Sequence, residues 1–509
     1  MPPWTSDDLR EWVRGQYGSE QLLILANREP FSHERRADGS VVVSHSTSGL
    51  VTALEPLVRA TGGVWIAHGS GSADRATVEP HDAPGVPPDE RCYRLRRVWL
   101  DEDELHGYYD GFANQGLWPL CHRVHVRPLF RPDDFNSYWN INGRFVDALC
   151  DEASSDAPIV LVQDYHLALA PQMIRERLPN SIIATFWHIP WPSWESFEIC
   201  PWGRHLVEGL LGSDVIGLQT PADCRNFLDT VGRSLEAHID RERGEVTYAG
   251  GHTTVRAYPA SIEWPDRLAA ASPPVEICRR EVRASLGLQP DVRLAVGVAR
   301  VDYTKGIEEA FAALERLLEC YPEYRGALTF VQVAEPSRTR LQAYRDLHTR
   351  ITAAADRVNV RFGGDGYRPA ILLDRHAEPA DVYRVLRAAD VCYVSSLHDG
   401  MNLLAKQFVA ARDDLAGALV LSQFAGAARE LSEALIVNPY DIDEAAHALV
   451  RALVMPDAEQ RCRMSRMRET VAEDNACKWA ARMLADVLRV RGQEEIAARR
   501  QSRQAFLPA

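Results

Sequence analysis

The sequence predicts an α/β fold with mostly parallel sheets, divided into at least two large domains. From Leu22 onward, short apolar runs typical of buried strands alternate with amphipathic stretches typical of helices. At 509 residues the chain is too long for one ordinary hydrophobic core. Polar residues also follow strand ends repeatedly, at Arg28, Asp164, His188, Gln219, Arg300 and Asp399. In open α/β sheets the ligand crevice lies outside those carboxyl ends, so we expect these side chains to line binding sites.

The first domain is predicted from five apolar runs and the helices that follow them. The runs are Leu22–Ala26, Val64–Ala67, Ile159–Gln163, Ser181–Trp187 and Val215–Gln219, and Thr254–Pro259 completes the domain. A hairpin is expected around residues 36–40, a helix from Ser48 to about Arg59, and a Pro-rich loop over 72–90.

The second domain is predicted to open at Arg293–Arg300 and to continue through strands near 328–334, 391–396, 418–422 and 434–437. Proline-containing residues between the domains read as a linker. We therefore expect a first domain over 1–264, a linker over 265–290, a second domain over 291–470 and charged C-terminal helices over 471–509.

Composition narrows the class of protein. Charged residues make up 25% and hydrophobic residues 46%, which is ordinary for a soluble globular protein. The net charge of -14 argues against a nucleic-acid or anionic-membrane surface. Ten cysteines without a C-x-x-C pair, an acidic N-terminus unlike a signal peptide and no apolar run of bilayer length predict a cytoplasmic protein.

One turn in the second domain resembles a phosphate cradle. His398–Asn402 contains one glycine and lies between an apolar strand and the helix-forming residues Leu403–Ala410. A strand, a glycine turn and a helix N-terminus together present unpaired N–H groups and the positive end of a helix dipole. This pattern favours a phosphate at the carboxyl edge of the sheet.

Five motifs together resemble the trehalose-6-phosphate synthase family. They are Asp164–Leu167, His188–Pro192, Arg300–Gly306, Asp399–Leu403 and Ser422–Glu430, the last followed by Asn438–Asp441. The resemblance covers roughly Leu22 to Leu484. It implies a GT-B architecture, in which two Rossmann-like domains face a central cleft and a C-terminal helix crosses back to the first domain. It also implies retaining transfer of glucose from a nucleotide-glucose, with UDP-glucose favoured, to glucose 6-phosphate.

The resemblance assigns the donor side. Arg300 and Lys305 match the diphosphate-binding pair, and fixed positive charge suits a leaving group on which negative charge develops. Asp399 resembles the carboxylate that accepts hydrogen bonds from the donor glucose hydroxyls, and His188 resembles the residue that contacts the 6-hydroxyl. Arg300, Lys305, Asp399 and His188 are the catalytic candidates. The remaining donor-binding candidates are Gly49, Gly400, Met401, Asn402, Leu403, Leu404 and Gln407.

The resemblance assigns the acceptor side to Arg28, Tyr109, Trp118, Asp164 and Arg338. Two arginines suit a phosphate dianion, Trp118 offers an apolar face to a sugar ring, and Asp164 accepts from sugar hydroxyls. No covalent intermediate, metal or other cofactor is expected, and the D-x-D sequences at Asp101 and Asp441 read as helix-start or loop acids.

Gln407 is the main departure from the family, which usually has Glu at the ribose-binding position. An amide has one oxygen acceptor and no charge, so we expect donor affinity to be lower by about 1–2 kcal/mol. Smaller departures are Ser48, His68 and Pro259–Glu263.

Three alternatives stay open from the sequence: a glucosylglycerol-phosphate synthase, a pseudo-glycosyltransferase, or a silent sugar-phosphate sensor. Because no phosphatase segment follows the second domain, we expect a separate trehalose-6-phosphate phosphatase to act on the product. The sequence leaves a homo-oligomer open.

Overall fold

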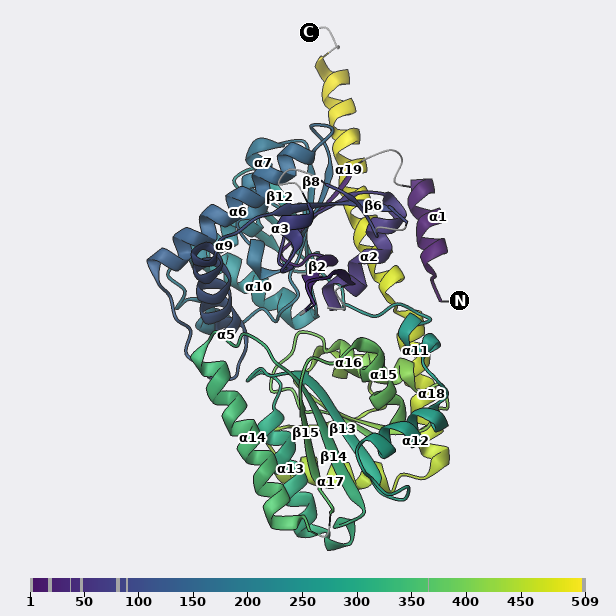
Figure 1. Ribbon diagram of the computed structural model, residues 1–509. Helices are drawn as coiled ribbons and strands as arrows, with labels where there is room; N and C mark the ends of the chain where they lie inside the picture. Colours follow the sequence, from purple (N-terminus) through teal and green to yellow (C-terminus); the bar gives the residue numbers. More distant parts are fainter. Residues whose placement is uncertain are drawn as a thin grey trace. The chain divides into compact units, whose positions relative to one another are not determined.

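The computed structural model describes residues 3–16, 21–36, 38–45, 49–78, 83–87, 90–364 and 366–505. It contains two compact units. The N-terminal unit comprises residues 4–121, 125–260 and 476 onward, and the C-terminal unit comprises residues 122–124 and 261–475. Each unit is built on its own mainly parallel sheet (Figure 1).

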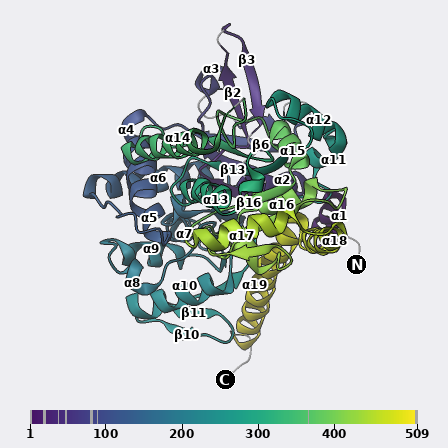
Figure 2. The same ribbon diagram turned by 90° about the horizontal axis from the view of Figure 1, so that it is seen from below.

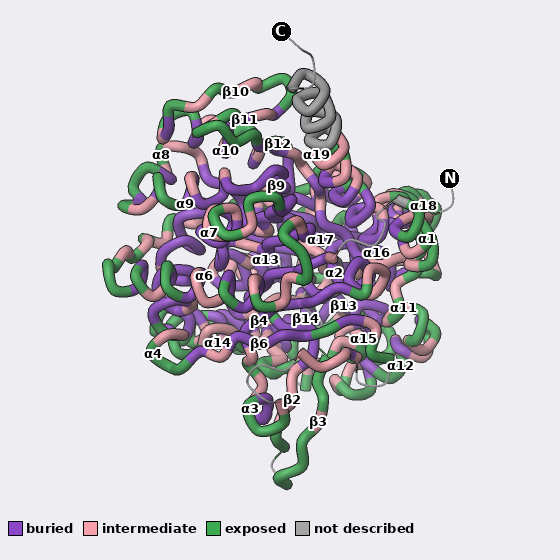
Figure 3. Tube along the Cα trace, turned by 90° about the horizontal axis from the view of Figure 1, so that it is seen from above, coloured by how far each residue is buried: buried purple, intermediate pink, exposed green. Residues whose placement is uncertain are grey.

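The sheet of the N-terminal unit has ten strands in the order β10-β11-β12-β9-β8-β7-β1-β4-β6-β5. Its parallel strands are β1 (Leu22–Ala26), β4 (Val64–His68), β6 (Tyr93–Val98), β7 (Ile159–Gln163), β8 (Ile182–Phe186), β9 (Val215–Leu218) and β12 (Gly251–Ala257). Antiparallel pairs β5 (Gly85–Val86) with β6, and β10 (His238–Asp240) with β11 (Glu245–Tyr248), flank them. Most of the parallel strands are fully buried, as expected of a sheet covered on both faces (Figure 3).

Helices connect these strands. They are α2 (Gly49–Thr61), α4 (Glu102–Leu105), the π-helix η1 (His106–Leu117), α5 (Trp118–Cys121), α6 (Pro132–Glu152), α7 (Ala170–Arg177), α8 (Trp194–Phe197), α9 (Gly203–Leu210) and α10 (Pro221–Ser234). The predicted hairpin is present as β2 (Phe31–Arg35) and β3 (Val41–His45), and its second strand is largely exposed (Figures 2 and 3). The predicted Pro-rich loop contains the short helix α3 (Asp74–Thr77) and strand β5.

The C-terminal helix α19 (Ala476–Ala505) belongs to the N-terminal unit, as the fold prediction expected. It packs on α1 (Ser6–Gln16), α2 and β8. The indole N–H of Trp479 donates to the carbonyl of Tyr258, and the Tyr258 hydroxyl donates to Asp486 over 2.6 Å.

The C-terminal unit holds a six-stranded, fully parallel sheet in the order β15-β14-β13-β16-β17-β18. The strands are β13 (Arg293–Arg300), β14 (Leu328–Glu335), β15 (Ala370–Asp374), β16 (Val391–Val394), β17 (Ala418–Ser422) and β18 (Leu435–Val437). One face is covered by α13 (Ile307–Cys320), α14 (Gln342–Phe362) and α17 (Ile442–Leu453). The other is covered by α15 (Pro379–Ala388), α16 (Leu403–Ala411) and α18 (Asp457–Glu473) (Figure 1).

The sequence assigned residues 265–290 to a linker, but the structure places two helices there. They are α11 (Arg267–Ala271) and α12 (Val275–Ser285), and both pack on α15. The prolines that suggested a linker precede these helices, where a missing N–H costs nothing. Strands β6 and β15 were also missed from the sequence. Among the described residues, no helix is both long and apolar enough to cross a bilayer.

Candidate functional site

The C-terminal unit has the strand order of a Rossmann fold. Numbered along the chain, its six strands lie in the order 3-2-1-4-5-6, so the crossover connections reverse direction between β13 and β16. At that switch point the flanking loops diverge and leave a crevice for a ligand. The two loops concerned, residues 301–306 and 395–402, carry the predicted Lys305 and Asp399.

Lys305 and Asp399 form an ion pair across the switch point. The ammonium lies 2.6 Å from Asp399 Oδ2, and each side chain is only 14% exposed. Burial opposes ionisation of Asp399, but the Lys305 ammonium and the Asn402 amide outweigh it and lower the pKa of the carboxyl. The switch point therefore brings together two groups of opposite charge type that are 94 residues apart in sequence.

Arg300 ends β13, and a buried carboxylate follows it. Asp302, which the sequence analysis did not single out, accepts a hydrogen bond from Arg338 Nη1 over 2.9 Å. Although burial opposes its ionisation, Arg338, Arg300 and Lys305 together lower the pKa of Asp302. Arg338 thus lies in the C-terminal unit with the two predicted diphosphate ligands, at a backbone φ of 49°.

The next predicted donor residues surround the N-terminus of α16. Asn402 caps this helix, because its side-chain oxygen accepts from the N–H of Ala405, and its amide donates to Asp399 Oδ2 over 3.0 Å. Gly400 and Met401 are buried in the preceding turn, whereas Leu403, Leu404 and Gln407 are half-buried in the first turns of the helix. The positive end of the helix dipole therefore lies beside the Lys305–Asp399 pair.

Two glycines allow the loops of this unit to approach closely. Gly306 has a φ of +63°, and a Cβ there would lie 2.0 Å from the carbonyl oxygen of Ser395. A Cβ on Gly426 would lie 2.1 Å from the carbonyl oxygen of Gly400. Gly306 and Gly426 both lie in family motifs, but the sequence did not indicate that a side chain is excluded at either position. The close approach of two loops has no local sequence signal.

The N-terminal unit repeats the arrangement. Its parallel strands lie in the order β6-β4-β1-β7-β8-β9-β12, so its switch point falls between β1 and β7. Arg28 follows β1 and is exposed, and Asp164 follows β7 with a φ of 71°. Asp164 Oδ1 accepts the N–H of His188, which follows the neighbouring strand β8.

His188 is held rigidly at the same edge of the sheet. Its Nε2 lies 3.0 Å from Gln163 Oε1, and its carbonyl accepts from the amide of Gln219. Burial lowers its pKa to about 3, so the imidazole is neutral at physiological pH. His188 can therefore exchange hydrogen bonds with a sugar hydroxyl but supplies no positive charge there.

Tyr109 lies in the 12-residue π-helix η1, and π-helical turns are rare and frequent at functional sites. Its ring stacks on His166 at a centroid distance of 5.4 Å. Trp118 follows η1 and lies 5.9 Å from the ring of Tyr165. Because Tyr165 and His166 directly follow Asp164, the structure brings four predicted acceptor residues, Arg28, Tyr109, Trp118 and Asp164, to the surroundings of one switch point.

The structure also gives the positions of Gly49 and of the two D-x-D sequences. Gly49 is the first residue of α2. Asp101 is the N-cap of α4 and Asp441 the N-cap of α17, so the reading of the D-x-D sequences as helix-start acids is confirmed. Among the described residues, no three His, Cys, Asp or Glu side chains are grouped so that they could hold a metal ion.

The chain has two Rossmann-like units, each with polar residues at its switch point. Together with the similarity to known proteins, this arrangement identifies a glycosyltransferase of the GT-B fold. The sequence pattern named Glycosyltransferase family 20 matches residues 20–489. The chain belongs to this family.

The similarity to individual proteins extends over almost the whole length of the chain. Trehalose-6-phosphate synthase of Mycobacterium avium is 39% identical over 477 residues, covering 92% of this chain and 95% of that protein. Among solved structures, the Escherichia coli protein bound with UDP-2-fluoro glucose is 33% identical with a TM-score of 0.81, covering 92% of this chain and 99% of that one. A UDP-forming α,α-trehalose-phosphate synthase of Burkholderia xenovorans in complex with glucose-6-phosphate is 32% identical with a TM-score of 0.80, covering the same shares.

Proposed function

We propose that this chain transfers glucose from UDP-glucose to glucose 6-phosphate, with retention, to give α,α-trehalose 6-phosphate and UDP. The observation that carries the proposal is the charged group of Arg300, Lys305 and Asp399 at the switch point beside the N-terminus of α16. Breaking a glycosyl–phosphate bond builds negative charge on the leaving diphosphate. Two cations and a helix N-terminus in a largely buried turn stabilise that charge without a metal.

In this mechanism the acceptor 1-hydroxyl attacks C1 of the donor glucose on the face that the diphosphate leaves. The bond from C1 to the diphosphate oxygen breaks, and the diphosphate takes the hydroxyl proton. Arg300 and Lys305 bind the diphosphate, Asp399 accepts from glucose hydroxyls and the neutral His188 contacts the 6-hydroxyl. The donor also contacts Gly49, the turn Gly400–Asn402, the α16 residues Leu403 and Leu404, and Gln407 at the ribose.

The acceptor is proposed to bind through the N-terminal unit and Arg338. Arg28 and Arg338 bind its phosphate, Tyr109 and Trp118 contact the ring, and Asp164 accepts from its hydroxyls. The positive φ of Asp164 supports a functional role, since strained backbone in a non-glycine residue is often retained for function. The domain roles follow: an acceptor domain over 1–264 and a donor domain over 291–470.

The reaction leaves the 6-phosphate untouched, so the product requires a separate phosphatase to become the free disaccharide. All ten cysteines carry free thiols, which supports a cytoplasmic location. The sequence also leaves a homo-oligomer open, and sedimentation analysis of the protein would measure its oligomeric state.

The test is nucleoside diphosphate release from UDP-, GDP- and ADP-glucose, each with glucose 6-phosphate and with glycerol 3-phosphate. We expect release that depends on UDP-glucose and glucose 6-phosphate, with an α,α-1,1-linked product by NMR. Release only with glycerol 3-phosphate would indicate a glucosylglycerol-phosphate synthase. Binding of glucose 6-phosphate without turnover of any donor would indicate a sensor, and a product without a glycosidic oxygen would indicate a pseudo-glycosyltransferase.

A further inference from the structure

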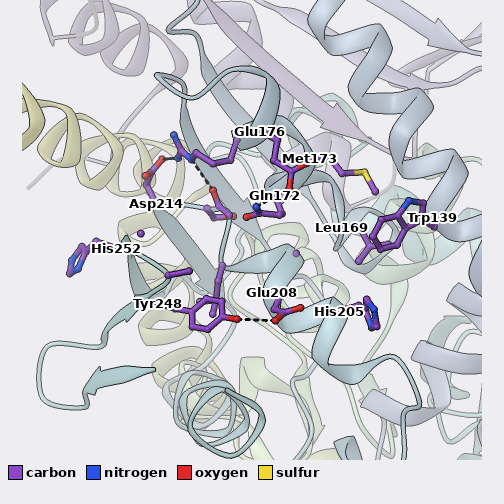
Figure 4. A pocket seen from close by; sticks show the side chains of 18 residues that line it. Trp139, Leu169, Gln172, Met173, Glu176, His205, Glu208, Asp214, Tyr248 and His252 are labelled. Atoms are coloured by element: carbon purple, nitrogen blue, oxygen red, sulfur yellow. Dashed lines mark hydrogen bonds and ion pairs between the residues drawn. The ribbon is translucent and has the colours of Figure 1, made fainter. Parts of the chain in front are cut away.

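A pocket lies in the N-terminal unit, away from its switch point. It has a volume of about 680 Å³, within the range of small-molecule sites, and is formed by α6, α7, α9 and the turn from β11 to β12 (Figure 4). Ser213 and Asp214 in its floor precede β9, so the pocket is at the amino ends of the strands. Arg28, Asp164 and His188 follow the carboxyl ends of strands in the same sheet, at the opposite edge.

The floor of the pocket is rigidly built. A Cβ on Gly212 would lie 2.4 Å from the backbone nitrogen of Gln172, and a Cβ on Gly209 would lie 2.5 Å from the carbonyl oxygen of Ala168. These glycines therefore let α9 and the segment after it approach α7 closely. Arg175 ties the same elements together, because it donates to the carbonyl of Gly212 and to Asp214 Oδ2 over 2.6 Å.

The charge of the lining excludes an anionic ligand. Arg175 is the single Lys or Arg among the residues that line this pocket, and its donors reach the carbonyls of Gly212, Pro179 and Ser181 as well as Asp214. Glu176 and Glu208 add negative charge to the walls. A phosphorylated sugar or a nucleotide-sugar would be repelled, so neither proposed substrate fits this pocket.

The polar side chains match hydroxyl groups better than a cation. Glu208 Oε1 already accepts from Arg204 over 3.0 Å and from the Tyr248 hydroxyl over 2.9 Å, which offsets part of its charge. The amide of Gln172 and the imidazoles of His205 and His252 each offer both donors and acceptors. Sugar hydroxyls need this mixture, whereas an organic cation needs acceptors alone.

One end of the pocket is apolar and open. Trp139 is 45% exposed and lies with Leu169 and Met173 on one side, while Tyr248 and His252 lie on the other (Figure 4). The indole makes an edge contact with His205 at a centroid distance of 6.2 Å. An exposed indole at the mouth of a polar pocket offers the apolar face on which a sugar ring stacks.

We propose that this pocket binds an uncharged disaccharide, which stacks one ring on Trp139 and places its hydroxyls against Glu176, Glu208 and His252. The site is separate from the substrate sites, so occupation by sugar and by glucose 6-phosphate is compatible. Binding is measured without turnover, so a failure of the proposed transfer reaction would leave the result unaffected.

The test is calorimetric titration of the full chain with α,α-trehalose and with maltose, each without and with saturating glucose 6-phosphate. We expect one bound disaccharide per chain for at least one probe, with at least tenfold weaker binding in Trp139→Ala and in His252→Ala. Both side chains are exposed, so folding should survive, and circular dichroism checks this. Val360→Ala, which truncates an exposed apolar side chain in the C-terminal unit, is the control and should bind normally.

Three results would overturn the proposal: neither sugar binds, glucose 6-phosphate displaces the sugar, or both pocket variants bind as tightly as the unaltered protein. A parallel titration with spermine tests the alternative that the pocket binds an organic cation. Tight spermine binding that is lost in Trp139→Ala, without disaccharide binding, would assign the pocket to a cation instead.

Discussion

Removing the ammonium of Lys305 should abolish transfer and also weaken the fold, and the two effects can be separated. The Lys305–Asp399 pair is 2.6 Å long with both side chains 14% exposed. At an effective dielectric constant of about 20, the gross attraction is about 6 kcal/mol, most of which offsets desolvation. Leaving Asp399 without this partner should cost about 3 kcal/mol, or about 6–12 °C in Tm for a unit of this size.

The catalytic effect should be larger than the stability loss explains. Removing one donor that stabilises charge in the transition state typically costs about 100–1000-fold in kcat. In Lys305→Ala we therefore expect UDP release to fall by at least 100-fold at a temperature where the protein remains folded. Arg300→Ala should behave similarly in the same assay.

The double variant Lys305→Ala/Asp399→Asn separates the two roles. Replacing both charges removes the uncompensated carboxylate, so most of the lost Tm should return while transfer stays abolished. Arg350→Ala breaks an exposed pair with Glu308 and should leave both Tm and turnover near normal. Near-normal UDP release in Lys305→Ala, or recovery of release in the double variant, would refute the role of Lys305 at the leaving group.

The remaining predictions concern single positions. Gln407→Glu should tighten UDP-glucose binding by about tenfold, measured as the donor KM, because a carboxylate accepts from both ribose hydroxyls; an unchanged KM would remove this residue from the ribose site. Asp164→Asn should raise the KM for glucose 6-phosphate without unfolding, since Asn tolerates the positive φ; a normal KM would contradict the acceptor role. Gly306→Ala should lower Tm and turnover together, because its Cβ would collide with the carbonyl of Ser395; an unchanged Tm would contradict the close approach. Burial raises the pKa of Glu29 to about 7 against the opposing charge of Arg97, so stability should fall as pH rises from about 4.5 to 7, and Glu29→Gln should flatten this slope in Tm.

Much of the two sheets could be predicted from local sequence. Buried parallel strands such as Ile159–Gln163 and Arg293–Arg300 are nearly continuous apolar runs. In a chain without an apolar segment of bilayer length, short runs of this kind indicate buried strands. Polar residues at the ends of such strands or in the loops that follow them located Arg28, Asp164, Arg300 and Asp399, because parallel strands place their carboxyl ends at one edge. The motifs then named the family.

Other features depended on contacts between residues far apart in the chain. Strand β6 carries Arg96 and Arg97, which local reasoning reads as surface residues. Arg97 is buried because Glu29 lies 2.7 Å from its Nε and Asp74 lies 3.3 Å from its Nη2, and those partners come from two other segments. The helices at 267–271 and 275–285 likewise form because α15 supplies a surface on which to pack.

The sequence by itself determined the alternation of strands and helices, the residue types at the strand ends and the family. Tertiary structure alone decided which strands are neighbours, and hence that Lys305 meets Asp399 and that Asp302 pairs with Arg338. It also decided that Gly306 must lack a Cβ and that a disaccharide-sized pocket lies at the amino edge of the first sheet. The physical reason is that hydrophobic periodicity is a local property, whereas ion pairs, close backbone approach and pockets depend on the distance between residues remote in sequence.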